Sequence, residues 1–292
     1  MSDHHHPQGE GNLKVAFFLN LIFTIIEIAG GLYTNSLAIL SDALHDLGDS
    51  LSLGLAWYFQ KLSKRGRSGK FTYGYKRFSL LGAIINSIVL VVGSVFILSK
   101  AIPGLFSPEE TNVQGMLFLA ILGIIVNGAA VMKLRNGHSL NEKVVSLHLW
   151  EDVLGWVAVL IGSIVMMFFD APFIDPLLSV LISVYVLYNV YKNIRKSMLI
   201  ILQGIPEEVD MEQIKLKLSR LNFVTDIHDC HIWSMDGEYN ILTIHLKLDK
   251  DYLLSELVAI KTSVHHQLRD EAINHITVEL EGRDEKCSMQ NC

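Results

Sequence analysis

The chain has few charged residues and few cysteines for its length of 292 residues. Charged side chains make up 18% of the sequence and half of the residues are hydrophobic, whereas an ordinary soluble protein is about 25% charged. This composition excludes the basic surface of a nucleic-acid-binding protein and favours a membrane protein. All three cysteines lie in the last quarter of the chain, where a cytoplasmic location would keep them reduced, so disulfides are not expected.

Six apolar segments are each long enough to cross a bilayer, which takes about 20 residues of helix. They cover residues 14–34, 37–60, 78–101, 114–134, 144–169 and 175–199. Basic residues follow the second, fourth and sixth segments, and the intervening loops carry acids. Because basic residues favour the cytoplasmic side, we expect both termini in the cytoplasm. The compact loops favour a bacterial inner membrane.

After residue 203 the chain becomes polar, and residues 204–292 are predicted to form a small cytoplasmic domain. Helical spacing covers 207–220 and 252–269, and strand-like alternation covers 224–235, 241–248 and 275–281. Asp236-Gly237 is a hairpin signal between the first two strands. This order, αββαβ, predicts a two-layer α+β domain after an all-α six-helix transmembrane domain at residues 14–203. Residues 1–13, with three consecutive histidines, are predicted to be a disordered tail.

Two apolar segments each carry a histidine followed four residues later by an aspartate: His45 with Asp49, and His148 with Asp152. This spacing places both side chains of a pair on one face of a helix, and ionisable groups inside a bilayer face a partner or a water-filled path. The two faces together offer two imidazole nitrogens and two carboxylate oxygens, which suits Zn²⁺ first among divalent metals. One pair alone could equally tie helices together by hydrogen bonds. A second pair at the same spacing favours a metal site.

Several separate motifs resemble the cation diffusion facilitator family. They are SLAILSDALHDLGDS, the YGYKRF segment before the third apolar segment, the His-x-x-x-Asp of the fifth, Asp175-Pro176 at the start of the sixth, and IHDCHIWSM in the tail. The likeness extends from about residue 14 to residue 281. It implies a homodimer with six membrane helices per chain and a metallochaperone-like cytoplasmic domain. It also implies export of zinc from the cytoplasm, driven by protons moving the other way.

The resemblance assigns His45, Asp49, His148 and Asp152 to the transport site. Asp42 lies three residues before His45 on the same helix face, where we expect it to orient the imidazole.

The resemblance also suggests a second zinc site in the tail, formed by His228, His245 and Glu281. Cys287 and Cys292, from the same or the partner subunit, would complete it. Their spacing differs from the C-x-x-C tails of the family, and two free thiols at the chain end are the alternative. Further histidines are candidates for an adjacent second ion, namely His231, His265 and His266.

The loop between the second and third apolar segments departs from members of the family that bind another metal there. Its sequence, RSGKFTYGYKR, is basic and has no good ligand, so we predict no metal in it. Its charge is expected to pair with anionic lipid, with the acidic tail or with the partner subunit.

A membrane protein that buries zinc ligands could instead be a protease. The chain lacks the His-Glu-x-x-His pattern of such enzymes, and four protein ligands leave no position for a catalytic water. We therefore expect a secondary active transporter, and no enzyme, that exports zinc by proton antiport with alternating access. Two alternatives stay open: a membrane metal sensor or scaffold without transport, and a transporter of Cd²⁺, Co²⁺, Fe²⁺ or Mn²⁺.

Overall fold

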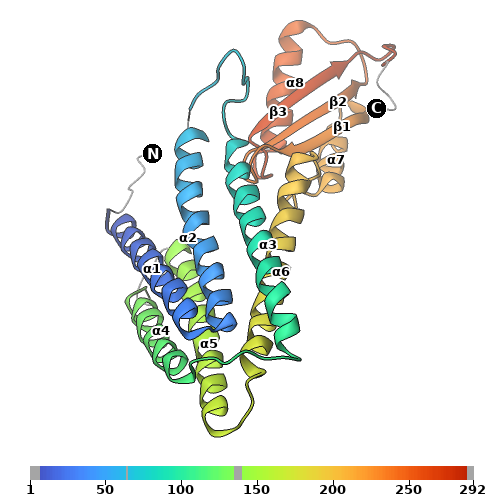
Figure 1. Cartoon of the computed structure of the whole chain (residues 1–292). Coiled ribbons are helices and arrows are strands. Elements are labelled where there is room, and N and C mark those ends of the chain that lie inside the picture. Colours follow the sequence, from blue (N-terminus) through green and yellow to red (C-terminus); the bar gives the residue numbers. More distant parts are fainter. Residues whose placement is uncertain (1–6, 64, 135–139, 288–292) are drawn as a thin grey trace. The chain divides into compact units, whose positions relative to one another are not determined.

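A computed structural model describes residues 7–63, 65–134 and 140–287 of the chain (Figure 1). The fold divides into two compact units, each built from two separate stretches of sequence. The first unit comprises Met1–Tyr58 and Gly82–Ile194, and the second comprises Phe59–Leu81 and Arg195–Cys292. Each unit is described by itself below.

The first unit is helical. It is built from α1 (Pro7–Thr34), α2 (Leu37–Ser63), α3 (Phe78–Gly104), α4 (Val113–Leu134), α5 (Leu140–Phe168) and α6 (Ile174–Ile201). The last turn of α2, the first of α3 and the last two of α6 belong to the second unit. These helices correspond to the six predicted apolar segments. Helix α1 begins at Pro7, so the prediction that residues 7–13 belong to a disordered tail is wrong, and residues 1–6 lie outside the described residues. Among the described residues, α3, α4, α5 and α6 are long and apolar enough to cross a membrane, and Asn20–Thr34 in α1 is a shorter apolar helix. The prediction of a helical transmembrane domain is therefore confirmed.

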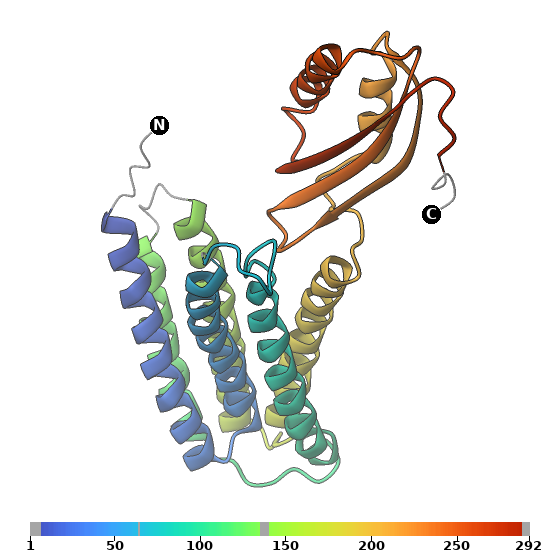
Figure 2. The same cartoon turned by 90° about the horizontal axis from the view of Figure 1, so that it is seen from above.

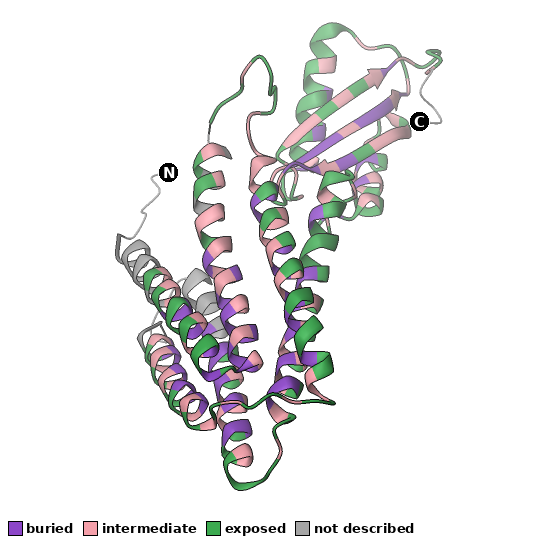
Figure 3. Cartoon of the chain, in the orientation of Figure 1, coloured by how far each residue is buried: buried purple, intermediate pink, exposed green. Residues whose placement is uncertain are grey.

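The outer sides of these helices carry many exposed apolar residues (Figure 3). On α3, for example, Val92 is 64% exposed, Val95 56% and Phe96 66%. Such a surface would be unfavourable in water, whereas lipid tails are as apolar as the side chains themselves. The buried positions of the helices face one another instead.

Close packing joins α1, α2, α4 and α5 around Trp156, which is fully buried on α5. Phe23 on α1 contacts its indole edge-to-face, with ring centroids 5.8 Å apart. Gly123 on α4 makes this arrangement possible, because a Cβ atom there would lie 2.3 Å from the indole ring.

Asp175, at the start of α6, caps the start of α2. Its Oδ1 accepts hydrogen bonds from the Ser36 hydroxyl at 2.5 Å and from the Ala38 amide at 3.2 Å, and its Oδ2 accepts one from the Leu37 amide at 2.8 Å. The first amides of a helix have no partner within the helix, so this carboxylate satisfies them. The helix that carries His45 and Asp49 is thereby fixed to α6.

The second unit contains a three-stranded sheet and two helices. In chain order the elements are α7 (Met211–Ser219), β1 (Val224–Ser234), β2 (Asn240–Leu248), α8 (Leu254–Gln267) and β3 (His275–Glu281). The strand order is β1-β2-β3, with β1 antiparallel and β3 parallel to β2. Both helices pack on the same face of the sheet (Figure 2), where Ile214 and Leu218 of α7 and Val264 of α8 join its apolar side chains. The predicted αββαβ domain is confirmed.

The first tail helix is shorter than predicted. It begins at Met211 because Asp210 acts as its N-cap, with Oδ1 accepting from the amides of Glu212 at 3.0 Å and Gln213 at 3.3 Å. The predicted start at residue 207 is therefore wrong, since a capping residue adopts an extended backbone rather than a helical one.

The loop before α3 contacts the hairpin between β1 and β2, within the second unit. The Lys76 ammonium lies 4.0 Å from Asp236 Oδ2 and 4.2 Å from the centre of the Tyr239 ring. Tyr73 of the same loop packs edge-on against His275, with ring centroids 5.9 Å apart. Of the partners that the sequence left open for this basic loop, the structure shows contact with the acidic tail.

Candidate functional site

The His45–Asp49 pair lies on one face of α2, as its spacing predicts. His45 Nε2 is 3.6 Å from Asp49 Oδ2, and the two side chains are 15% and 26% exposed. Asp152 on α5 is 4% exposed. His148 lies one turn earlier in α5, but its side chain is outside the part of the chain that the structure describes.

Of these groups, His45 and Asp152 line a cavity of about 420 Å³. His45 and Asp42 from α2, Asp152 and Glu151 from α5, and apolar residues of α6 line it. The cavity therefore connects His45 of the first predicted pair with Asp152 of the second. Ionisable groups within a membrane unit are tolerated where they line a cavity that water can enter.

Asp42 faces α5 across this cavity. Its Oδ1 would lie 3.4 Å from a Cβ atom at Gly155. Its carboxylate is also close enough to Asp152 and Asp49 for the like charges to repel. This places Asp42 among the carboxylates of the site. Its role in orienting His45 stays a prediction.

Two more buried acids surround the site, Glu27 on α1 and Asp46 on α2, which are 0% and 1% exposed. Glu27 interacts electrostatically with Asp42, Asp46 and Asp152. Asn20 of α1 reaches the backbone carbonyl of Asp46 at 3.4 Å, so α1 is hydrogen-bonded to the helix that carries the His-Asp pair. Several carboxylates gathered in one membrane unit attract cations.

Tyr185 on α6 is a site residue that sequence reasoning missed. Its ring meets the His45 ring edge-on at a centroid distance of 6.3 Å, and its hydroxyl donates to Glu151 Oε2 at 3.1 Å. Tyr185 thus contacts a residue of α2 and a residue of α5. Helix α6 contains three tyrosines, Tyr185, Tyr188 and Tyr191, and nothing in the sequence distinguishes the first of them.

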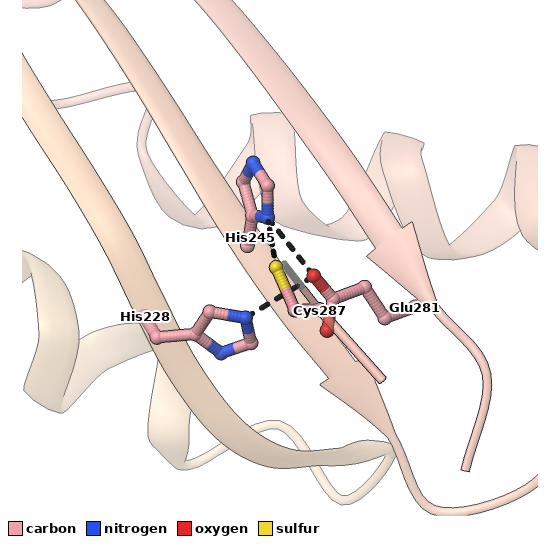
Figure 4. A group of neighbouring side chains, drawn as sticks. All are labelled: His228, His245, Glu281 and Cys287. Carbon is pink, nitrogen blue, oxygen red and sulfur yellow. Dashed lines mark hydrogen bonds and ion pairs between the residues drawn. The ribbon is translucent and has the colours of Figure 1, made fainter. Parts of the chain in front are cut away.

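A second cluster of candidate ligands lies in the sheet domain, where His228, His245, Glu281 and Cys287 come together (Figure 4). Glu281 Oε1 is 3.1 Å from His228 Nε2 and 2.9 Å from His245 Nδ1. Cys287 Sγ is 3.6 Å from His245 Nδ1. The four possible ligand atoms all lie within 4.8 Å of one another.

The strands place this cluster on the sheet face opposite the helices. Leu246 of β2 and Leu280 of β3 belong to the core beneath α7 and α8. Successive side chains of a strand point to opposite faces, so His245 and Glu281 point away from that core. His228 is paired directly with His245 across β1 and β2. The structure thus brings together four of the five predicted tail ligands, and the fifth, Cys292, is outside the described residues.

The surroundings of Glu281 favour its charged form. Burial alone would raise the pKa of this carboxyl, but hydrogen bonds from Cys287 and His245 and the nearby His228 outweigh it, so the pKa lies below its ordinary value. Metal binding requires a deprotonated carboxylate. Glu281 is therefore deprotonated at neutral pH, which is the form of the carboxyl that can bind a cation.

The three histidines predicted for an adjacent second ion are not members of the four-residue cluster. His231 Nε2 is 2.9 Å from Asp229 Oδ1, while His265 and His266 are exposed on α8, which packs on the opposite face of the sheet. The predicted second ion at these three residues stays a prediction.

Comparisons with known proteins agree with this picture across nearly the whole chain. Residues 13–202 match the family model described as "Cation efflux transmembrane domain". Residues 206–283 match that described as "Cation efflux protein, cytoplasmic domain", a dimerisation domain.

Curated relatives align over almost their full length. The "Cadmium, cobalt and zinc/H(+)-K(+) antiporter" of Bacillus velezensis is 34% identical over 288 residues, covering 96% of this chain and 92% of the relative. The "Metal cation efflux system protein CzcD" of Cupriavidus metallidurans is 34% identical, covering 95% and 89%. The "Zinc transporter ZitB" of Yersinia pseudotuberculosis is 33% identical, covering 96% and 89%. This chain therefore belongs to the cation efflux family of multi-pass membrane proteins, which transport divalent metal cations and are not enzymes.

Proposed function

We propose that the chain exports Zn²⁺ from the cytoplasm through His45, Asp49, His148 and Asp152, in exchange for protons. The observation that carries the proposal is the cavity that joins His45 of α2 to Asp152 of α5 inside the helical unit. Two imidazoles and two carboxylates suit zinc geometrically and chemically. Two of the three relatives have zinc in their names, one of them together with cadmium and cobalt, and the third is named for metal cations in general.

Exchange of zinc for protons follows because both compete for the same ligand atoms. Histidine and carboxylate bind a metal only when deprotonated, so zinc loading and protonation exclude each other. The ligands would bind Zn²⁺ in a state open to the cytoplasm and release it to protons in a state open to the other side. Histidine suits this exchange because its charge changes near neutral pH. The surrounding acids Glu27, Asp42 and Asp46 would help a divalent cation to enter an apolar unit.

Residues 14–203 would form the transport domain and residues 204–292 a cytoplasmic domain, with both chain termini on the cytoplasmic side. The working form would be a homodimer, in keeping with the dimerisation domain that residues 206–283 match. The tail cluster suits Zn²⁺ as a resident ligand, because it combines two imidazoles, a carboxylate and a thiol within 4.8 Å. Bound there, zinc would join β1, β2, β3 and the segment after β3, and would regulate transport.

Zinc uptake into proteoliposomes tests the transport proposal. Vesicles carry a zinc-sensitive dye and a pH gradient, and the intact chain is compared with Asp152→Ala and with Asp170→Ala, which alters an exposed acid in the loop after α5. We expect flux that stops when the gradient is dissipated, falls at least about 100-fold in Asp152→Ala, and persists in Asp170→Ala. Zinc binding without flux in either gradient direction would instead indicate a sensor or scaffold.

A further inference from the structure

Both histidines of the tail cluster have a carboxylate near each ring nitrogen. His228 has Nε2 at 3.1 Å from Glu281 and Nδ1 at 3.1 Å from Asp226 Oδ2. His245 has Nδ1 at 2.9 Å from Glu281 and Nε2 at 3.3 Å from Asp229 Oδ2. One nitrogen of each ring therefore faces the cluster (Figure 4), and the other nitrogen faces an aspartate outside it.

The backbone of β1 is irregular where these aspartates lie. The register with β2 shifts between Val224 and Asp226 and again between His228 and His231. Asp229 has a φ of +45°, which is uncommon for a residue other than glycine. In a regular strand Asp229 would point to the face opposite His228. The left-handed conformation instead brings its carboxylate beside His245.

Burial makes the Asp229 contact the stronger of the two. The Asp229 and His245 side chains are 9% and 8% exposed, whereas Asp226 is 58% exposed. The second oxygen of Asp229 lies 2.9 Å from His231 Nε2. Glu279 also faces His245 Nε2, at 3.4 Å, but its side chain is 62% exposed.

A neutral imidazole has one N–H group and one lone pair, on different nitrogens. For His245 to bind a metal through Nδ1, its proton must be on Nε2, where it donates to Asp229. For His228 the arrangement is reversed, because Nε2 faces the cluster and Nδ1 donates to Asp226. Carboxylates in such positions fix the ring and make the ligand more basic.

We propose that Asp229, and more weakly Asp226, are positioning residues of the tail metal site. They select the ring nitrogen that His245 and His228 present to a zinc-like divalent cation. The inference depends on the tail metal site of the proposed function, and it adds two residues that do not contact the ion.

Cobalt titration of the full-length chain tests this, in an Asp152→Ala background that weakens the transport site. Co²⁺ replaces Zn²⁺ and gives a charge-transfer absorption when bound to a thiolate, which reports the site containing Cys287. The transport site has no sulfur ligand, and replacing both Cys287 and Cys292 by serine must abolish the band. The variants are Asp229→Gly, Asp229→Asn and Asp226→Asn, with exposed Asp270→Gly as the control.

The two Asp229 variants separate positioning from folding. Glycine adopts a positive φ without strain, so Asp229→Gly should keep or raise the thermal midpoint while it removes the acceptor. Asparagine tolerates the same conformation and keeps an acceptor oxygen. We expect the Kd for Co²⁺ to rise about 10- to 100-fold in Asp229→Gly. We expect a smaller rise in Asp229→Asn and Asp226→Asn, and no change in Asp270→Gly.

Nitrogen-15 NMR of the zinc-loaded chain, labelled at histidine, gives a second readout. We expect the proton of His245 on Nε2 and that of His228 on Nδ1. The opposite tautomers, or an unchanged Kd in Asp229→Gly, would overturn the positioning role and leave the metal site standing. Absence of the thiolate–cobalt band in the parent chain would overturn the tail site and the positioning role together.

Discussion

At the scale of single residues, two tail cysteines have contrasting surroundings. Cys230 in β1 packs against the core beneath the helices, and burial raises the pKa of its thiol to about 11, with nearby Asp229 adding to the effect. Cys287 lies beside His245 and Glu281 in the metal cluster. The first thiol is a packing residue, and the second is a ligand candidate.

This contrast predicts selective alkylation by N-ethylmaleimide. The thiolate is the reactive form, and a pKa raised from 9 to about 11 leaves about 100-fold less thiolate at neutral pH. In a Cys292→Ser background, we expect Cys287 to be modified rapidly, Cys230 to be modified only after unfolding, and Zn²⁺ to protect Cys287. Mass spectrometry of tryptic peptides measures both sites. Rapid labelling of Cys230 in the folded chain would contradict its burial.

At the scale of elements, the contact of α4 with α5 depends on the absence of a side chain at Gly123. A Cβ atom there would lie 2.3–2.6 Å from indole atoms of Trp156, and this large ring is fully buried. Trp156 follows Asp152 by one helical turn. Any shift of this contact therefore moves a proposed zinc ligand.

We expect Gly123→Ala to lower stability by about 1–3 kcal/mol, as overpacking of a core does, and to reduce zinc flux. Gly128 on the same helix is the matched control, because no described atom outside its own helical turn lies within 4 Å of a Cβ placed there. Gly128→Ala should keep stability or raise it by up to about 1 kcal/mol, because alanine is the better helix former. Thermal unfolding in detergent, followed by size-exclusion chromatography, measures both. Equal stability of the two variants would show that α4 and α5 pack less tightly at Trp156 than the structure indicates.

The sequence predicts elements better than contacts between them. Apolar length predicts α1 to α6, and the alternation around Asp236-Gly237 predicts β1 and β2, because both signals are local. The cap of α2 by Asp175 joins residues 138 positions apart, so no local pattern reveals it. No local pattern reveals the contacts of Tyr185 or Asp229 either. The position of Asp229 depends on a bulge. His45 and Asp49 could be predicted because their spacing alone places them on one helix face.

At the scale of the whole molecule, Lys76 attaches the loop before α3 to the β1–β2 hairpin. Its ammonium contacts Asp236 and the Tyr239 ring. An exposed ion pair alone contributes little, and a cation–π contact adds about 0.5–1 kcal/mol. The attachment is therefore weak enough to be lost by a single substitution.

Limited trypsin digestion measures this attachment, because the loop itself contains lysines and arginines. Tyr239→Leu leaves the loop sequence unchanged but removes the ring. We expect cleavage at residues 65–77 to become about fivefold faster, corresponding to a loss of about 1 kcal/mol. Glu238→Gln, at an exposed neighbouring position, is the control and should be cleaved at the original rate. If the Tyr239→Leu variant were cleaved no faster than this control, the loop would be held by other contacts.

The discontinuous second unit has a consequence for truncation. Because Phe59–Leu81 and Arg195–Cys292 form one compact body, deleting the chain after residue 203 would also strip Tyr73 and Lys76 of their contacts. A truncated protein that failed to move metal would then have lost the support of a loop between two membrane helices as well as a metal cluster. Point substitutions such as His245→Ala separate these two losses, and a shortened gene cannot.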